Sequence, residues 1–243
     1  MSILKKASRF AARHLTCRWL PLGKEKGVVS FTFDDVPASA CHRGAELLQQ
    51  YQARGTFYIC GGLTDGVEQT QACHSVRDLH NLVAAGHELG CHTFSHTNCA
   101  NTSLMEIQRD WDKNQAFFHA EKLPLSGFAF PFGAYDFGSK VAASKRFFYN
   151  RITGGGAQLR RADLSALRAQ ALYAATTPSD VILKLIQQVA SDGGWLIFYS
   201  HEVSAHPGPW GTTPEQLEMA LRLATQEGCR ILPVQDAITF FQT

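Results

Sequence analysis

The sequence predicts an α/β fold built on a parallel sheet. Short runs of apolar and β-branched residues alternate with segments of helical periodicity along nearly the whole chain, beginning with the run at 28–33. This alternation is typical of parallel strands joined by right-handed helical crossovers. Charged and imidazole side chains directly follow several of these runs, and binding residues gather at the carboxyl ends of parallel strands. Both observations predict a functional site at one edge of the sheet.

Strands are expected where β-branched and aromatic residues are concentrated, and helices where apolar residues recur every three or four positions. Gly86 closes one helix, and Ser103 with Glu106 forms a capping box at the start of another. The expected strands are 28–33, 56–60, 87–91, 128–130, 147–152, 195–199 and 230–234. The expected helices are 38–53, 76–85, 103–120, 140–144, 179–190 and 213–225, with a loop at 63–73.

Two adjacent carboxylates, Asp34 and Asp35, follow the first strand. Successive side chains on a strand point to opposite faces, so both can serve one pocket only where the strand gives way to a loop. Two anions at the end of an apolar strand also favour a nearby cation. The alternative is structural, because an Asp that precedes Val36-Pro37 and a helix commonly caps that helix.

A second polar segment, His92-Thr93-Phe94-Ser95-His96, follows the strand expected at 87–91. Its two histidines are four residues apart, so one turn places both rings on the same side. Two imidazoles and a carboxylate form a three-ligand set that leaves positions open for water or substrate. Such sets suit catalytic zinc, iron(II) and related divalent metals. The adjacent Cys91 could supply a sulfur ligand, but a packed strand residue is the preferred interpretation.

Together, Thr32-Phe33-Asp34-Asp35 and His92-Thr93-Phe94-Ser95-His96 resemble the polysaccharide deacetylases, the NodB-like carbohydrate esterases. The signature of that family is a TFDD strand end followed by H-[ST]-x-x-H. The resemblance runs from about Val28 to about Phe241. It implies a distorted (β/α) barrel of about seven strands, of NodB-homology type, as one domain over residues 28–243.

The resemblance also assigns chemical roles. Asp34 is the expected general base, which takes a proton from water. His201 follows the apolar strand 195–199 and matches the family's L-x-H motif, with Tyr199 in place of Leu. It is the expected general acid. The divalent metal, zinc first with Co²⁺, Ni²⁺ or Fe²⁺ as alternatives, would be held by Asp35, His92 and His96.

The segment 128–133 departs from the family pattern. It resembles R-x-P-Y-G, but Ala129 stands where the family has Arg, and Phe132 replaces Tyr. The family's Arg orients the catalytic Asp, and a carboxylate that acts as a base needs such a partner. We hypothesise that Arg151, at the end of the next strand, supplies the guanidinium from an adjacent position; the alternative is a surface arginine.

Further residues are candidates for contact with substrate. A backbone N–H near Phe132 is the expected oxyanion donor, by family resemblance. Tyr135 and Trp210 are further candidates for contact with substrate. The loop 204–213, which carries Trp210, could form a wall of the pocket or gate it. The family often has an Asp that tunes the general acid; Asp163 is the candidate, with a helix cap as its alternative.

Composition limits the other functions. The hydrophobic content is 45% and the charged content 18% over 243 residues, as in a folded domain with a substantial core. A net charge of +2 with no basic–aromatic run argues against nucleic-acid binding. The seven cysteines form no CxxC pair and favour reduced thiols in a cytoplasmic protein.

Residues 1–27 are expected to form a basic helical extension without a signal peptide. An amphipathic helix of this kind could rest on an anionic membrane surface, which would make the protein peripherally membrane-associated. The preferred alternative is an extra helix that packs against the barrel. No segment is apolar over the length that crosses a membrane.

Three functions follow from these residues. The first is a metal-dependent deacetylase that acts on an N-acetylated amino sugar in a poly- or oligosaccharide or a lipid-linked glycan. The second keeps the site and hydrolyses a small non-sugar amide or cyclic ureide. The third is a catalytically silent carbohydrate-binding homologue, which the missing Arg at Ala129 favours.

Overall fold

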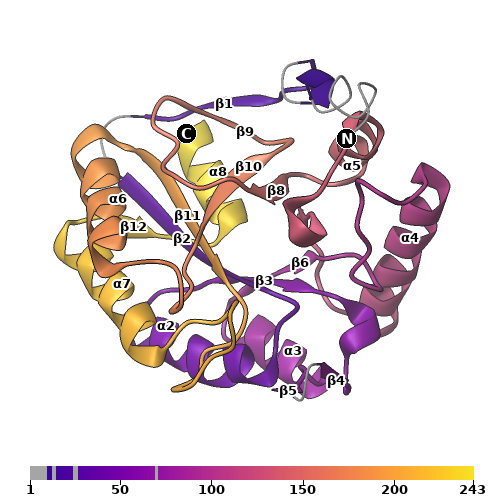
Figure 1. The fold of residues 1–243 in the computed structure, drawn as a ribbon, viewed down its shortest axis with the longest axis horizontal. Helices are drawn as coiled ribbons and strands as arrows, with labels where there is room; N and C mark the ends of the chain where they lie inside the picture. Colours follow the sequence, from indigo (N-terminus) through magenta and orange to yellow (C-terminus); the bar gives the residue numbers. More distant parts are fainter. Residues whose placement is uncertain (1–9, 13–14, 24–26, 69–70) are drawn as a thin grey trace.

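Seven parallel strands close into a barrel in the computed structural model (Figure 1), which describes residues 10–12, 15–23, 27–68 and 71–243. The last strand of the ring pairs with the first over seven residue pairs, which closes the sheet on itself. This is the (β/α) barrel expected from the sequence. The ring consists, in spatial order, of β2 (Gly27–Asp34), β3 (Thr56–Ile59), β6 (Glu88–Cys91), β7 (Phe128–Ala129), β8 (Asn150–Thr153), β10 (Leu167–Ala171) and β11 (Gly194–Ser200).

Helices surround the barrel because most crossovers between parallel strands run outside it (Figure 1). A π-helical turn, Ala40–Gly44, precedes the first of them. None of the described helices has the length and apolarity needed to span a membrane. The helices are α2 (Ala45–Gln50), α3 (Val76–Ala84), α4 (Leu104–Ala120), α5 (Phe137–Arg146), α6 (Ser179–Asp192), α7 (Pro214–Gln226) and α8 (Val234–Gln242).

The final segment differs from the expectation of a strand over 230–234. The strand there, β12 (Arg230–Ile231), pairs only with Val28 and Val29 of β2. Pro233 then starts α8, because proline cannot donate to a strand ladder and its fixed φ suits the beginning of a helix. Helix α8 packs its apolar face against the barrel core beside Trp195.

Three further segments differ from expectation. Strand β10 of the ring (Leu167–Ala171) lies where no strand was expected. The expected loop 63–73 contains a short hairpin of β4 (Val67–Glu68) and β5 (Gln71–Ala72). Much of the expected N-terminal helical extension lies outside the described residues, but Trp19–Pro21 is not helical. It forms β1, which pairs antiparallel with β9 (Arg161–Asp163).

Apolar side chains pack against both faces of β2. All eight residues of β2 are buried. Phe31 and Phe33 belong to one apolar cluster with side chains of α2, α3, α6 and α7, whereas Val28 belongs to a second cluster with Trp195 and α8. This packing holds the carboxyl end of β2, where Asp34 ends the strand, in a fixed position.

Candidate active site

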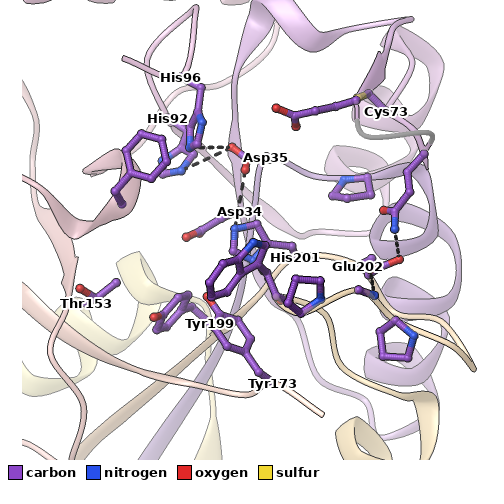
Figure 2. Close-up of a pocket in the computed structure, with 18 of the residues that line it drawn as sticks. Asp34, Asp35, Cys73, His92, His96, Thr153, Tyr173, Tyr199, His201 and Glu202 are labelled. Carbon is purple, nitrogen blue, oxygen red and sulfur yellow. Dashed lines mark hydrogen bonds and ion pairs between the residues drawn. The ribbon is translucent and has the colours of Figure 1, made fainter. Parts of the chain in front are cut away.

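A cavity of about 880 Å³ opens at the carboxyl ends of the barrel strands (Figure 2). Its walls come from the ends of β2 and β11, the loops that follow β6 and β7, the β4–β5 hairpin and the segment after β11. The cavity brings together seven of the nine residues predicted from the sequence. These are Asp34, Asp35, His92, His96, Phe132, His201 and Trp210.

Asp35 lies at the centre of this cluster and faces three imidazoles. Its Oδ1 is 3.6 Å from Nε2 of His92 and 3.3 Å from Nε2 of His96, and its Oδ2 is 3.6 Å from Nε2 of His201. Burial raises the pKa of Asp35 to about 7, with His201 opposing and Asp34 adding to the shift. Asp35 therefore gains more from a cation than a carboxylate in water would.

His92 is held with its Nε2 toward Asp35. Nδ1 of His92 lies 2.8 Å from the carbonyl of Ala129, so it carries the proton and leaves Nε2 unprotonated. Burial lowers the pKa of His92 to about 3, and burial also lowers the pKa of His96. Both rings are therefore neutral at pH 7, which is the form that binds metals.

Residues 93–97 form a tightly held loop after β6. The carboxylate of Asp110 on α4 accepts hydrogen bonds from the backbone N–H groups of Phe94 and Ser95, at 2.8 and 3.1 Å. Thr93 Oγ1 accepts another from the N–H of Thr97 at 2.9 Å. The loop needs this support because Thr93 and His96 have φ of 64° and 52°. Such angles are costly for residues other than glycine and cluster at functional sites.

The turn after β2 has the same unusual backbone. Asp35 and Val36 have φ of 57° and 56°, and this change of direction lets Asp35 face the cavity together with Asp34. A β-branched residue with positive φ is a rare outlier that persists only where the surroundings enforce it. Neither aspartate caps a helix in this structure, so the structural alternative for the pair does not hold.

Three ligand atoms, one each from Asp35, His92 and His96, lie within 4.8 Å of one another. One oxygen and two nitrogen donors suit zinc and other divalent transition metals. The two neutral rings and the buried carboxylate fit such an ion. Cys91 does not join this set: its Sγ faces the side chain of Asn114 at 3.1 Å, as expected for a packed strand residue.

Arg151 forms a buried ion pair with Asp34, as hypothesised from the sequence. Its Nη2 donates to Oδ1 of Asp34, and the guanidinium is fully buried. Burial alone would raise the pKa of Asp34, but Arg151 foremost, with nearby imidazoles, leaves that pKa below its usual value. Asp34 is therefore ionised at neutral pH.

The location of Arg151 explains how it replaces the missing arginine. Ala129 on β7 and Arg151 on β8 are directly paired in the sheet. The guanidinium therefore comes from the neighbouring strand, β8, and reaches Asp34 from there. Tyr58 and Tyr199 accommodate it, with Cζ of Arg151 5.0 and 5.2 Å from their ring centroids. The hydroxyphenyl ring of Tyr199, where the family has Leu, therefore contacts the relocated arginine.

His201 lies across the cavity from His92 and His96 (Figure 2). Its Nδ1 is 3.1 Å from the carbonyl of Trp210, so Nδ1 carries the proton when the ring is neutral and Nε2 faces Asp35. Asp163 does not tune this histidine. It lies in β9, where it binds Nζ of Lys140 at 2.7 Å and the backbone N–H of Arg18 at 2.9 Å.

The candidate substrate residues divide into two groups. Phe132 is 62% exposed, has φ of 60° and lies with its ring 4.4 Å from that of His96. Trp210 is 54% exposed on the His201 side of the cavity. Tyr135 is not part of the cavity wall: its ring packs against Phe130 at 5.4 Å, because the turn at 131–133 directs it toward the apolar cluster under α4 and α5.

Several residues of the site were not found from the sequence. Asp110 lies in the middle of α4, and its only signal was a carboxylate on the buried face of that helix. Glu68 and Gln71 reach the cavity from the hairpin that was expected to be an irregular loop. Glu202 follows His201 directly but gave no sign of its partners, which are far away in the sequence.

Residues 22–147 match the family model for polysaccharide deacetylase, which is more than half of the chain. The chain belongs to the polysaccharide deacetylase family. It is also 28% identical over 101 residues to a peptidoglycan-N-acetylglucosamine deacetylase of Bacillus cereus, a match that covers 41% of this chain and 43% of that protein. The chain spans less than half of the length of the curated relatives it matches.

Solved structures agree with the barrel fold. A family 4 acetyl xylan esterase from Clostridium thermocellum, in complex with a cobalt ion, superposes with a TM-score of 0.61 at 20% identity, covering 88% of this chain and 91% of the other. A CE4 family pseudoenzyme from Bacillus anthracis superposes with a TM-score of 0.62 at 18% identity, covering 89% and 66%. At this identity the likeness concerns the fold, and it includes a protein described as a pseudoenzyme.

Proposed function

We propose that this protein is a metal-dependent hydrolase that removes an N-acyl group, acetyl first, from an amino sugar. The observation that carries the proposal is the buried Asp34–Arg151 pair beside the Asp35, His92 and His96 donor set. The carboxylate of Asp34 is ionised and held by Arg151 beside this donor set, as a general base requires. Membership of the family supports hydrolytic removal of acyl groups from carbohydrates.

Asp35, His92 and His96 would hold the divalent metal, with zinc as the first choice. A metal ion in that position would polarise the acyl carbonyl and lower the pKa of water from 15.7 to about 7. Neutral His92 and His96 supply their Nε2 atoms without first losing a proton. The ionised carboxylate of Asp35 would offset part of the positive charge of the metal.

Asp34 would act as the general base. It is ionised at neutral pH, 4% exposed, and held by Arg151 so that its carboxylate faces the cavity. From there it accepts a proton from the attacking water. The fixed orientation matters, because general base catalysis depends on a short and well-aligned path for the proton.

His201 would act as the general acid on the other side of the substrate. Its Nδ1–H is directed to the carbonyl of Trp210, so the second proton of the imidazolium form lies on Nε2, and this is the proton that would pass to the departing amine. The N–H of Phe132, on its strained turn, would bind the oxyanion. Exposed rings of Phe132 and Trp210 on two sides of the cavity suit contact with the faces of a sugar.

The cavity volume lies within the range of sites that bind small molecules, about 300–1,000 Å³. This favours a short or terminal sugar residue, from an oligosaccharide or a lipid-linked glycan, over the interior of a long polymer. The same volume also accepts a small non-sugar amide, which is the second candidate. A binding-only role loses its main argument, because Arg151 supplies the cation that Ala129 cannot.

The test is acetate release from a panel of N-acetylated mono- and oligosaccharides and small amides by zinc-loaded protein. We expect release from the sugars and a loss of about 10²–10⁴-fold in Asp34→Asn, the typical contribution of acid–base catalysis. Asp180→Asn, an exposed carboxylate on α6, is the matched control and should be fully active. Release only from the small amides would favour the second candidate. Metal binding without any release would favour a silent homologue.

A further inference from the structure

The carboxylate of Glu202 forms hydrogen bonds that connect the segment after His201 to itself and to the β4–β5 hairpin. This segment, residues 202–212, forms the wall of the cavity opposite His92 and His96 (Figure 2). Glu202 is 7% exposed, and its two carboxylate oxygens have different partners. Oε1 accepts the backbone N–H of Gly208, from the same segment, and Oε2 accepts Nε2 of Gln71, from the β4–β5 hairpin.

The segment is folded closely around this carboxylate. The carbonyl of Glu202 accepts the N–H of Thr212 at 3.0 Å, and Gly211 donates to the carbonyl of Gly208 at 3.2 Å. A Cβ on Gly211 would lie 2.3 Å from Cγ of Glu202, so only glycine fits there. The side chain of Glu202 is thus the centre about which the segment turns.

The segment in turn controls the general acid. The carbonyl of Trp210 accepts hydrogen bonds from Nδ1 and from the backbone N–H of His201, at 3.1 and 3.2 Å. The hydroxyl of Ser200 is a third donor to it, at 3.4 Å. Within the part of the chain that the structure describes, this carbonyl is the recorded hydrogen-bond partner of Nδ1. A backbone atom therefore does what a carboxylate does for many catalytic histidines.

We propose that Glu202 is a positioning residue for the general acid. By folding residues 202–212 about its carboxylate and joining them to Gln71, it fixes the Trp210 carbonyl that sets the orientation and tautomer of His201. This inference rests on the proposed function, in which His201 protonates the leaving amine. It adds a pair of residues, Glu202 and Gln71, that do not touch the reacting atoms.

The test compares two acetylated substrates with zinc-loaded protein. An N-acetylglucosamine oligomer has an amine leaving group that must be protonated, whereas 4-nitrophenyl acetate has a leaving group that needs no proton. General acid catalysis contributes about 10²–10⁴-fold, and we expect Glu202→Ala to lose at least about tenfold of it in kcat for the oligomer. For the nitrophenyl ester the expected change in kcat is less than about threefold, with unchanged zinc content.

An exchange of the two side chains is the matched control. Gln71→Glu alone places a second carboxylate against that of Glu202 and should reproduce the loss of activity on the oligomer. Glu202→Gln combined with Gln71→Glu restores every partner, because the amide now at position 202 accepts from the N–H of Gly208 and donates to the carboxylate now at position 71. Activity on the oligomer should then return. Equal losses on both substrates, or a defect that the exchange does not repair, would overturn the proposal and leave Glu202 a purely structural residue.

The tautomer of His201 provides a readout without catalysis. In ¹⁵N NMR of histidine-labelled protein, with His201→Gln for assignment, the wild type should show Nδ1 protonated. Glu202→Ala should show a mixture of tautomers, and an unchanged tautomer would contradict the proposal. This result stands even if the wild type hydrolyses no N-acetylated sugar, in which case the proposed function fails separately.

Discussion

The two ends of the barrel each enclose a carboxylate, and the two are held very differently. Glu88, at the amino end of β6, accepts hydrogen bonds from Thr56, Ser126 and Tyr149 hydroxyls at 2.7, 2.5 and 2.7 Å, and from a backbone N–H of α8 at 3.1 Å. Asp35, at the carboxyl end of β2, faces three imidazole nitrogens at 3.3–3.6 Å, distances too long for good hydrogen bonds.

This difference separates a fully hydrogen-bonded structural carboxylate, Glu88, from Asp35, the proposed metal ligand. Burial raises the pKa of both groups, so the shift alone does not separate them. Glu88 has a full set of neutral donors and ordinary backbone around it. Asp35 has the neutral rings of His92 and His96 beside it, a long contact from the Cys60 thiol at 3.6 Å and a strained backbone, so a cation would stabilise its charge more than these neighbours do.

At the carboxyl end of the barrel, breaking the Asp34–Arg151 ion pair should cause the largest loss of activity. Arg151→Ala leaves Asp34 buried without its cation, and we expect activity to fall by about 10²–10⁴-fold because the base loses its orientation and its charge state. Arg151→Ala combined with Ala129→Arg returns the guanidinium to the paired position on β7 and should restore part of the activity. Steady-state deacetylation rates measure both. No recovery in the combined variant, with the fold intact by circular dichroism, would argue against relocation of the arginine.

Asp35→Asn should abolish tight zinc binding, because it removes the charged ligand. The loss should exceed the about 10–100-fold that changes outside the ligand set typically cost. Isothermal titration with zinc measures it, with His119→Ala, an exposed histidine on α4, as the control. Wild-type affinity in Asp35→Asn would remove Asp35 from the ligand set.

Asp110→Ala should weaken zinc binding by about 10–100-fold without removing a ligand. Its carboxylate holds the N–H groups of Phe94 and Ser95, so its loss frees the loop that carries His96. The same titration measures the affinity, with Asp112→Ala, an exposed residue on the same helix, as the control. An unchanged affinity would mean that the loop keeps its shape without Asp110.

Glu88→Gln should affect stability and leave zinc binding unchanged. The substitution replaces one carboxylate oxygen, each of which accepts two hydrogen bonds, by an NH₂ donor, at a cost of about 1–3 kcal/mol in the free energy of unfolding. Urea denaturation and zinc titration of the same variant give the two quantities. A loss of zinc affinity would break the separation between the two ends of the barrel.

The smallest expected effect is the pH dependence of the metal-free protein. Asp35 has a pKa of about 7 in the folded state and 3.8 as a free side chain, so the folded state binds more protons between these values. Stability from this group is present at low pH and is lost as pH rises toward about 7. Asp35→Asn should therefore melt a few degrees above metal-free wild type at pH 8, with a smaller difference at pH 4. Equal differences at both pH values would contradict the raised pKa.

The sequence was most informative where chemistry follows a strand directly. Asp34, Asp35, His92 and His201 each lie at or just after a strand end, and parallel strands bring such residues to one edge whatever their distance along the chain. Pattern and topology were sufficient for these positions. Arg151 was expected at the end of the strand at 147–152; it is instead the second residue of β8, paired with Ala129, and still reaches Asp34.

Other residues depend on tertiary contacts that no local pattern encodes. Gln71 and Glu202 meet although 131 residues separate them, and neither has a signature of its own. Tyr135 was expected at the cavity, but a single turn at Phe132 directs its ring into the apolar cluster. Helix α8 was missed because its apolar residues continue a strand-like run, and only Pro233 marks the boundary.

The location of the metal itself tests the proposed site most directly. Crystals of zinc-loaded protein, measured above and below the zinc absorption edge, give an anomalous difference map of bound zinc. We predict one strong peak among Asp35, His92 and His96, with Asp34 bonded to Arg151 and not to the ion. A peak coordinated by Asp34, or bound zinc only outside this cavity, would contradict the proposed metal site.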